Sequence, residues 1–267
     1  PAELPEPVAG PGQAVVGLAA ADVIYLDTLL RSGWGGEFFP TRTPYVPGHG
    51  GAGRVLSVGE GVDPGWVGRH VVAWASGGYA ERLVAAVEEL VEVPDGLGSA
   101  EAAAVMHDGT TALRLLAEAQ LSTGEWVLIA AAAGGAGSLL VQLARDAGAR
   151  VVAAARGERK LALVRELGAE VAVDYSVDGW QHRVREATGG AGVDLAFDGA
   201  GQGRTHRART ARHGRQVAAA HLAPGGVTPG RGSAQRSQGA EYSPSWCRMA
   251  TRSSRAQISV IRPSAIR

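Results

Sequence analysis

Two hydrophobic patterns follow one another along the chain. From Gln13 to about Pro94, short apolar runs are separated by glycines, prolines and polar turns such as Asp63-Pro64-Gly65. Regular short runs of this kind predict β-strands in a compact, barrel-like domain. The expected strands are Ala14–Leu18, Gly53–Val58, Arg69–Ala73 and Glu89–Val93.

From Ser99 onward the apolar spacing becomes helical, and it predicts two helices, Ser99–Met106 and Thr110–Ala119. After Gly124, short apolar strands alternate with amphipathic helices, which predicts a doubly wound parallel sheet with right-handed crossovers. The first of these strands, Trp126–Ala131, is apolar throughout, as expected of a strand buried on both faces. The later elements are Gly135–Ala147, Val151–Ala154, Arg159–Leu167, Val171–Val173, Trp180–Ala187 and Val193–Phe197, beginning with a helix and ending with a strand.

A run of small residues joins the strand Trp126–Ala131 to the helix that follows it. Ala132, Gly134 and Gly137 have the spacing of the dinucleotide-binding fingerprint, with alanine in place of its first glycine. Small residues let the backbone approach a pyrophosphate, and the start of a helix offers unpaired amides and partial positive charge. The alternative is a plain turn between a strand and a helix.

The end of the second strand of this sheet bears on the choice of cofactor. NAD sites usually place a carboxylate there, whereas this chain has Ala155-Arg156-Gly157 followed by Arg159 and Lys160, with Glu158 between them. Lys160 is the only lysine in the chain, and it lies at a helix start, where the dipole disfavours a cation. The pattern therefore favours NADPH, whose 2′-phosphate would relieve that conflict. The alternative is a solvated basic helix start.

The β-domain holds further polar and aromatic candidates. Asp27 either orients a substrate or caps a turn. His49 and His107 could be metal ligands or proton donors. No cysteine or carboxylate accompanies them at zinc-like spacing, so the sequence favours structural histidines over metal ligands. Four aromatic residues would form either a flat pocket for a ring substrate or a satellite core: Trp34, Phe38, Phe39 and Tyr45.

Composition narrows the class of protein. The 267 residues are 45% hydrophobic, enough for real cores. The longest apolar run, Val127–Ala133, is far shorter than the roughly 20 residues of a membrane span. Pro1–Pro11 lacks the plan of a signal peptide, and the single cysteine, Cys247, excludes an internal disulfide. We expect a cytoplasmic protein.

Charge divides the chain near Gly203. Residues 204–267 hold 12 of the 26 basic side chains, all arginine, and one acid, Glu241. Apart from a fifth strand expected at Val217–Ala220, this segment lacks a sustained apolar period, which predicts disorder or a changed reading frame. Its arginines also suggest an alternative function, in which the tail of a catalytically impaired nucleotide-binding protein contacts RNA or another polyanion.

Five stretches of the chain together resemble one family, the medium-chain dehydrogenase/reductase superfamily in its zinc-independent quinone oxidoreductase branch. The resemblance spans about residues 1–200. It implies a GroES-like β-barrel catalytic domain (1–107), an incomplete Rossmann domain (108–203) and an atypical tail (204–267), with NADPH in the cleft between the two domains. The matching stretches are Asp27-Thr28…Arg31-Ser32-Gly33, Pro47-Gly48…Ala52-Gly53, Gly109-Thr110-Thr111-Ala112, Ala131–Gly137 and Gly168-Ala169…Asp174-Tyr175.

The same resemblance implies roles for individual residues. The zinc-dependent relatives carry cysteine at the position of Ile24 and glutamate at that of Gly50, and quinone reductases commonly carry asparagine at Ile24; a catalytic zinc is therefore not expected. The implied reaction is hydride transfer from NADPH to a quinone, an enone or another electron-poor alkene. The relatives also imply a possible homodimer. By position, Thr111 would face the nicotinamide, and Lys160 and Tyr175 would surround the 2′-phosphate. The pyrophosphate would contact Gly134, Gly135, Ala136 and Gly137. From their own places in the sequence, Arg156 joins the phosphate group and Asp27 joins Thr111 as a candidate catalytic residue.

Overall fold

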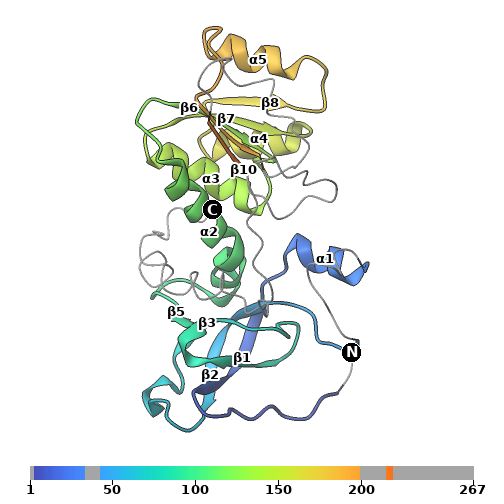
Figure 1. Cartoon of the computed structure of the whole chain (residues 1–267), viewed down its shortest axis with the longest axis vertical. Coiled ribbons are helices and arrows are strands. Elements are labelled where there is room, and N and C mark those ends of the chain that lie inside the picture. Colours follow the sequence, from blue (N-terminus) through green and yellow to red (C-terminus); the bar gives the residue numbers. More distant parts are fainter. Residues whose placement is uncertain (1–2, 34–42, 199–214, 219–267) are drawn as a thin grey trace, which may run out of the picture. The chain divides into compact units, whose positions relative to one another are not determined.

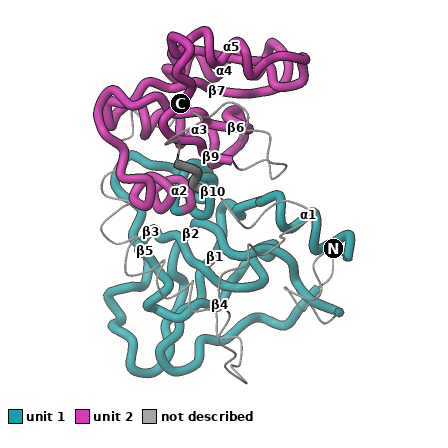
Figure 2. Tube along the Cα trace, turned by 45° about the horizontal axis from the view of Figure 1, so that its top comes forward, with its two compact units in different colours: residues 1–110, 244–267 teal, residues 111–243 magenta. Residues whose placement is uncertain are grey.

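The computed structural model describes residues 3–33, 43–198 and 215–218 (Figure 1). The described chain divides between Thr110 and Thr111 into two compact units (Figure 2). Each unit has hydrophobic clusters of its own. No helix among the described residues is long and apolar enough to cross a membrane.

The first unit contains a five-stranded antiparallel sheet in the order β4-β1-β2-β3-β5. Four of these strands were expected from the sequence, whereas β4 and the short helix α1 (Tyr25–Arg31) were not. Buried alanine, valine and leucine side chains from neighbouring strands fill the core of the sheet. The strands are β1 (Gln13–Ala21), β2 (Gly50–Val58), β3 (His70–Trp74), β4 (Arg82–Ala86) and β5 (Leu90–Glu92), with single 3-10 turns at Pro64–Trp66 and Val87–Glu89.

One continuous helix, α2 (Ser99–Ala119), replaces the two helices expected from the sequence. The expected break at Gly109 is wrong, because an isolated glycine weakens a helix by only about 1 kcal/mol and packing can sustain it. Gly109 is buried. The Thr110 hydroxyl donates a hydrogen bond to the Met106 carbonyl at 2.6 Å, one turn earlier in the helix.

The second unit is a parallel sheet in the order β10-β9-β6-β7-β8. Its strands and helices alternate along the chain, and the helices α3 and α4 end just before Gly148 and Gly168, where the sequence predicted them to stop. The elements are β6 (Trp126–Ala130), α3 (Gly135–Asp146), β7 (Arg150–Ala155), α4 (Glu158–Glu166), β8 (Val171–Asp174), α5 (Trp180–Ala187), β9 (Leu195–Asp198) and β10 (Arg215–Ala218).

Helices cover both faces of this sheet. Val127 and Ile129 of β6 pack with buried residues of α3 and α4. Leu128, between them in the sequence, faces the opposite side and packs with Trp180 and Val184 of α5. Alternate side chains of one strand thus enter two cores, which confirms the doubly wound α/β fold.

The last described strand tests one expectation for the C-terminal segment. A strand was expected at Val217–Ala220, and β10 covers Arg215–Ala218, two residues earlier. It pairs in parallel with β9, with Val217 opposite Phe197. The other predictions for the tail fall on residues 204–214 and 219–267, outside the described residues.

Candidate active site

The turn after β6 brings its backbone very close to α3. Ala131 has φ +52°, a left-handed conformation that residues other than glycine rarely adopt. Gly134 precedes the helix in an extended conformation. A Cβ atom on Gly137 would lie 2.3 Å from the Ala131 carbonyl oxygen and 2.9 Å from the Ala132 Cα. Only glycine at position 137 permits this approach of helix and strand.

The strain at Ala131 makes a testable prediction. Ala131→Gly should raise the free energy of unfolding by about 0.5–1 kcal/mol, since glycine adopts the left-handed region freely but also gains freedom in the unfolded chain. Urea denaturation measures this change. Ala132→Gly is the control, because Ala132 is buried and has no positive φ, and it should destabilise the protein. Equal losses in both variants would contradict the prediction.

The start of α3 presents unpaired backbone donors. Gly135, Ala136 and Gly137 are its first three residues, whose N–H groups have no partner within a helix. No side chain caps this end. The Ser138 N–H is the first in the helix to be satisfied, by the Gly134 carbonyl at 2.8 Å. These amides and the helix dipole together suit a bound anion.

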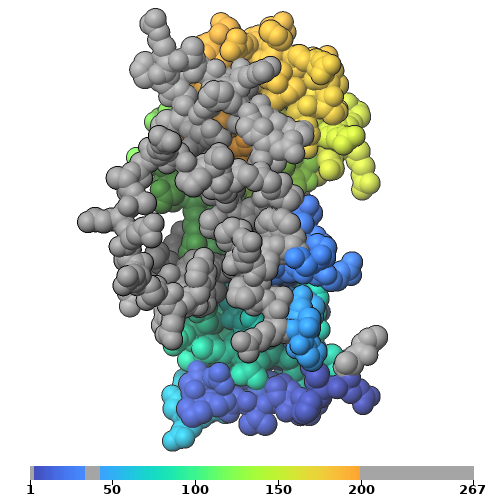
Figure 3. Space-filling model, turned by 45° about the vertical axis from the view of Figure 1, so that its right-hand side comes forward, coloured from blue at the N-terminus to red at the C-terminus, as the bar shows by residue number. Residues whose placement is uncertain are grey.

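Three cations follow the neighbouring strand at the same edge of the sheet. β6 and β7 are parallel, and their ends are in register, with Ala130 opposite Ala154. Arg156, Arg159 and Lys160 come directly after β7, and all three are exposed, within the yellow-green part of the surface in Figure 3. The turn after β6 and this basic segment therefore leave adjacent strands in the same direction.

Asp174 fixes the backbone of the basic segment. It ends β8 opposite Ala155, and its Oδ2 accepts the Gly157 N–H at 2.9 Å. Its Oδ1 accepts the hydroxyl of Ser176 at 2.6 Å and the Ser176 N–H at 2.8 Å. The Ser176 hydroxyl, its N–H, the Gly157 N–H and the charge of Arg156, in that order, lower the pKa of Asp174. Asp174 was not among the predicted binding residues, and the sequence signal was its place at a strand end.

Glu158 is the acid that leaves NAD open as an alternative. It begins α4, and its carboxylate accepts a hydrogen bond from the Arg165 guanidinium at 2.6 Å, two turns further along the helix. Both side chains are exposed, so the pair contributes little stability. The Glu158 carboxylate is thus paired with Arg165 of the same helix.

The two remaining predicted residues of this unit lie on different elements. Tyr175 directly follows β8; its N–H donates to the Ala155 carbonyl at 3.2 Å, which places it beside Arg156 across the strands. Its ring packs against the hydrophobic cluster under α5. Thr111 lies in the middle of α2, partly exposed, next to the buried Ala112. The structure thus brings Arg156, Lys160 and Tyr175 to one sheet edge, and their binding roles stay predictions.

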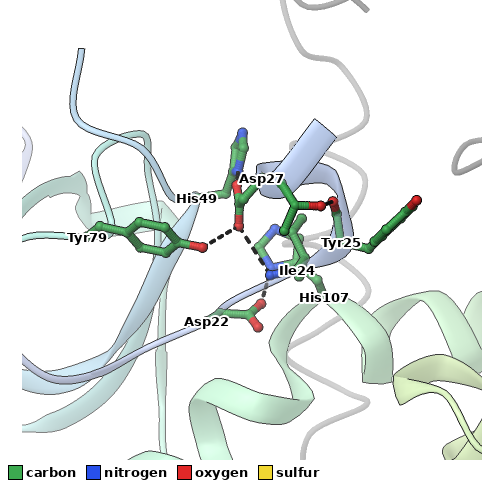
Figure 4. Close-up of polar contacts among 8 residues, drawn as sticks. Asp22, Ile24, Tyr25, Asp27, His49, Tyr79 and His107 are labelled. Carbon is green, nitrogen blue, oxygen red and sulfur yellow. Dashed lines mark hydrogen bonds and ion pairs between the residues drawn. The ribbon is translucent and has the colours of Figure 1, made fainter. Parts of the chain in front are cut away.

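In the first unit, Asp27 both caps a helix and joins a polar network (Figure 4). Its Oδ2 accepts the Ile24 N–H at 3.1 Å, which caps α1, and the Tyr79 hydroxyl at 2.8 Å. Its Oδ1 contacts the His49 Nδ1 at 3.0 Å. The residue is only 7% exposed. Asp27 thus caps a helix, as one of its two alternatives expected, and also orients a histidine; its role toward a substrate stays a prediction.

A second carboxylate–histidine pair lies beside the first. His107 of α2 forms a hydrogen bond through Nδ1 to the carboxylate of Asp22, which follows β1. The two histidine rings meet edge to face, with their centroids 6.2 Å apart (Figure 4). The sequence missed Asp22 and Tyr79, because their partners, His107 and Asp27, lie far away along the chain and only the tertiary fold brings them together.

The backbone at Gly50 excludes the glutamate of the zinc-dependent relatives. Gly50 has φ +139°, and a Cβ there would lie 2.2 Å from the Ala73 carbonyl oxygen and 2.8 Å from the Met106 Cε. Ile24, at the position of the relatives' cysteine, contributes only its backbone N–H to the network. Among the described residues, no group of three His, Cys, Asp or Glu side chains could hold a metal ion.

The aromatic cluster expected near position 40 is mostly untested. Tyr45 is 38% exposed. Trp34, Phe38 and Phe39 lie in the segment 34–42, outside the described residues.

Two families match separate parts of the chain. Residues 10–95 match the family described as "Alcohol dehydrogenase GroES-like domain". Residues 135–227 match the family described as "Zinc-binding dehydrogenase". The second match continues to residue 227 and corrects the expectation that the resemblance ends near residue 200. The similarity therefore includes the first part of the arginine-rich segment.

Similar proteins include two curated reductases and two solved structures. A 2-haloacrylate reductase of Burkholderia sp. is 34% identical over 223 residues, which are 82% of this chain and 67% of the relative. A Pseudomonas aeruginosa quinone oxidoreductase is 36% identical over 200 residues, and this chain spans only 59% of its length.

The solved structures agree with this relationship. A Pseudomonas syringae quinone oxidoreductase superposes with a TM-score of 0.71 at 32% identity, covering 79% of this chain and 66% of that one. A mycobacterial protein complexed with NADPH gives a TM-score of 0.73 at 34% identity, covering 85% and 72%. With the fold and the nucleotide fingerprint described above, these matches show that the chain belongs to the medium-chain dehydrogenase/reductase superfamily, in its zinc-independent quinone oxidoreductase branch.

Proposed function

We propose that this protein is an NADPH-dependent reductase of quinones, enones or other electron-poor alkenes. The observation that carries the proposal is the pairing, at one sheet edge, of an uncapped helix start with three exposed cations. A dinucleotide phosphate needs both features, since its pyrophosphate suits the open amides and its 2′-phosphate suits the cations. The end of β7 carries Ala155-Arg156 and no carboxylate, which supports NADPH over NADH.

The residues present fit such a nucleotide. The space that a Cβ of Gly137 would fill is closed by backbone, which keeps the amides of α3 tightly placed against the turn. Gly135, Ala136 and Gly137 would bind the pyrophosphate through their N–H groups, and Arg156, Lys160 and Tyr175 would bind the 2′-phosphate. Bound NADPH supplies a hydride, and the protein binds and orients both reactants.

The acceptor class is supported by the relatives. A quinone and a 2-haloacrylate, the compounds named for two of them, both contain a C=C bond conjugated to a carbonyl group. Such a bond accepts a hydride without a metal to polarise it.

Nucleotide titration tests the cofactor assignment. Lys160→Ala should weaken NADPH binding roughly 10-fold or more and leave NADH binding unchanged, because a charge-assisted hydrogen bond to phosphate contributes about 1.5–3 kcal/mol. Fluorescence titration measures both dissociation constants. Arg183→Ala is the matched control, since it removes an exposed positive charge from α5.

Two results would contradict the proposal. Equal affinity of the unaltered protein for the two nucleotides, unaffected by Lys160→Ala, would remove the phosphate assignment. A lack of NADPH oxidation with 1,4-benzoquinone, 9,10-phenanthrenequinone and a panel of enones would remove the reductase assignment.

A further inference from the structure

The Asp27 carboxylate determines which nitrogen of His49 carries a hydrogen. Its Oδ2 already accepts two hydrogen bonds, from the Ile24 N–H and the Tyr79 hydroxyl. Its Oδ1 contacts His49 Nδ1 at 3.0 Å, and an ionised carboxylate can only accept. Nδ1 is therefore the donor, and the ring is oriented with Nε2 left to exchange a proton with a ligand or water.

The side chains of Asp27 and His49 differ in how exposed they are. The Asp27 side chain is 5% exposed, whereas that of His49 is 32% exposed. The carboxylate is thus buried, while part of the imidazole reaches the surface of the unit. His49 also directly precedes β2, where close backbone contacts at Gly50 restrict movement.

The neighbouring groups fit less well as proton donors to a ligand. Burial, followed by the hydrogen bond to Asp27, raises the pKa of Tyr79, so its hydroxyl keeps the proton that it donates to Asp27. The His107 side chain is 16% exposed, half as much as that of His49. His49 is therefore the more exposed of the two histidines in the network.

We propose that His49 Nε2 donates the proton that completes substrate reduction, an inference that rests on the proposed reductase function. The substrate accepts a hydride from NADPH at one end of its conjugated system, its C=C electron pair shifts, and the negative charge collects on its carbonyl oxygen. The Nε2–H bond of protonated His49 then breaks, and the proton goes to that oxygen. His49 is left neutral, with Nδ1–H still on Asp27, and water reprotonates Nε2. NADPH leaves as NADP⁺.

Asparagine at position 49 separates the two functions of the imidazole. The amide nitrogen of His49→Asn can still donate to Asp27, but nothing replaces Nε2. We expect kcat to fall roughly 100-fold, a typical contribution of general acid catalysis, while the dissociation constant of NADPH stays unchanged. Added imidazole should restore part of the lost rate, and the solvent deuterium effect on kcat should change.

The matched control is His70→Asn. His70 belongs to the same unit, but its Nε2 bonds the Ser99 hydroxyl, away from the Asp27 network; its kcat should stay near that of the unaltered protein. A readout independent of turnover comes from nitrogen-15 NMR of histidine-labelled protein, which should show His49 with its hydrogen on Nδ1. If His49→Asn does not bind NADPH, the second variant is His49→Ala, which removes both ring nitrogens and whose lost rate added imidazole should partly restore.

Each contrary result has a distinct meaning. Equal rates in His49→Asn and His70→Asn, or a loss confined to His107→Asn, would overturn the role of His49 and leave the reductase proposal intact. Stoichiometric zinc that is lost in His49→Asn would overturn it as well. No turnover by the unaltered protein with any acceptor would refute the reductase proposal and this inference with it.

Discussion

Gly137→Ala is expected to destabilise the second unit by about 3 kcal/mol and to weaken NADPH binding roughly 100-fold. The new Cβ would lie 2.3 Å from the Ala131 carbonyl oxygen and 2.9 Å from the Ala132 Cα, and backbone atoms cannot rotate away as a side chain does. α3 must therefore move from the turn, and overpacking of this kind costs about 1–3 kcal/mol. The displaced amides lose charge-assisted hydrogen bonds to the pyrophosphate, each contributing about 1.5–3 kcal/mol.

Gly134→Ala is the control for this effect. Its Cβ would lie 3.2 Å from the Ala131 carbonyl oxygen, a contact that a shift of a few tenths of an ångström relieves. Fluorescence titration and urea denaturation of both variants measure the difference. If Gly137→Ala bound NADPH as well as Gly134→Ala, the close approach of α3 would be irrelevant to the nucleotide.

Gly50→Ala should lower the free energy of unfolding of the first unit by about 3 kcal/mol, and Gly50→Glu by at least as much. The Cβ would meet the Ala73 carbonyl oxygen at 2.2 Å, and φ is +139°. The expected loss combines overpacking with the strain of a side chain at positive φ. Because Gly50 adjoins His49, the same change should displace the imidazole from Asp27 and reduce turnover.

Gly68→Ala isolates the backbone contribution. Gly68 also has positive φ, +85°, but a Cβ there would meet nothing within 4 Å. Gly68→Ala should lower the free energy of unfolding by about 1 kcal/mol, which is the conformational contribution alone. Thermal and urea unfolding monitored by tryptophan fluorescence compares the two variants. Equal losses would show that the contact with Ala73 relaxes at little cost.

The elements that the sequence predicted well are those with local determinants. Strands β6 to β9 each carry an unbroken apolar run, and a glycine lies two residues after the end of α3 and of α4. α1 was missed because it has seven residues and no side-chain cap at Ile24. β4 was missed because Val84 is the only β-branched or aromatic residue in its sequence, Arg-Leu-Val-Ala-Ala.

The candidate sites also differ in whether their residues are close together in the sequence. The fingerprint from Ala132 to Gly137 could be recognised because the strand, the turn and the helix are contiguous. In the first unit, by contrast, Asp27 contacts His49 and Tyr79, which lie 22 and 52 positions further along the chain. The pairing of β1 with β2 and β4, and the hydrogen bond from the Tyr79 N–H to the Pro47 carbonyl, bring these segments together, and no spacing in the sequence specifies these contacts.

The basic segment after β7 also has a consequence for the survival of the protein in a cell. Arg156, Arg159 and Lys160 bring positive charge to a sheet edge that already carries open amides, so a bound polyanion would relieve repulsion in the folded chain alone. A ligand selective for the folded chain stabilises it by about 2.7 kcal/mol at 100 times its dissociation constant. We therefore expect proteolytic lifetime to lengthen as the phosphorylated dinucleotide, oxidised or reduced, becomes abundant, so that the supply of this nucleotide would set how much of the protein persists.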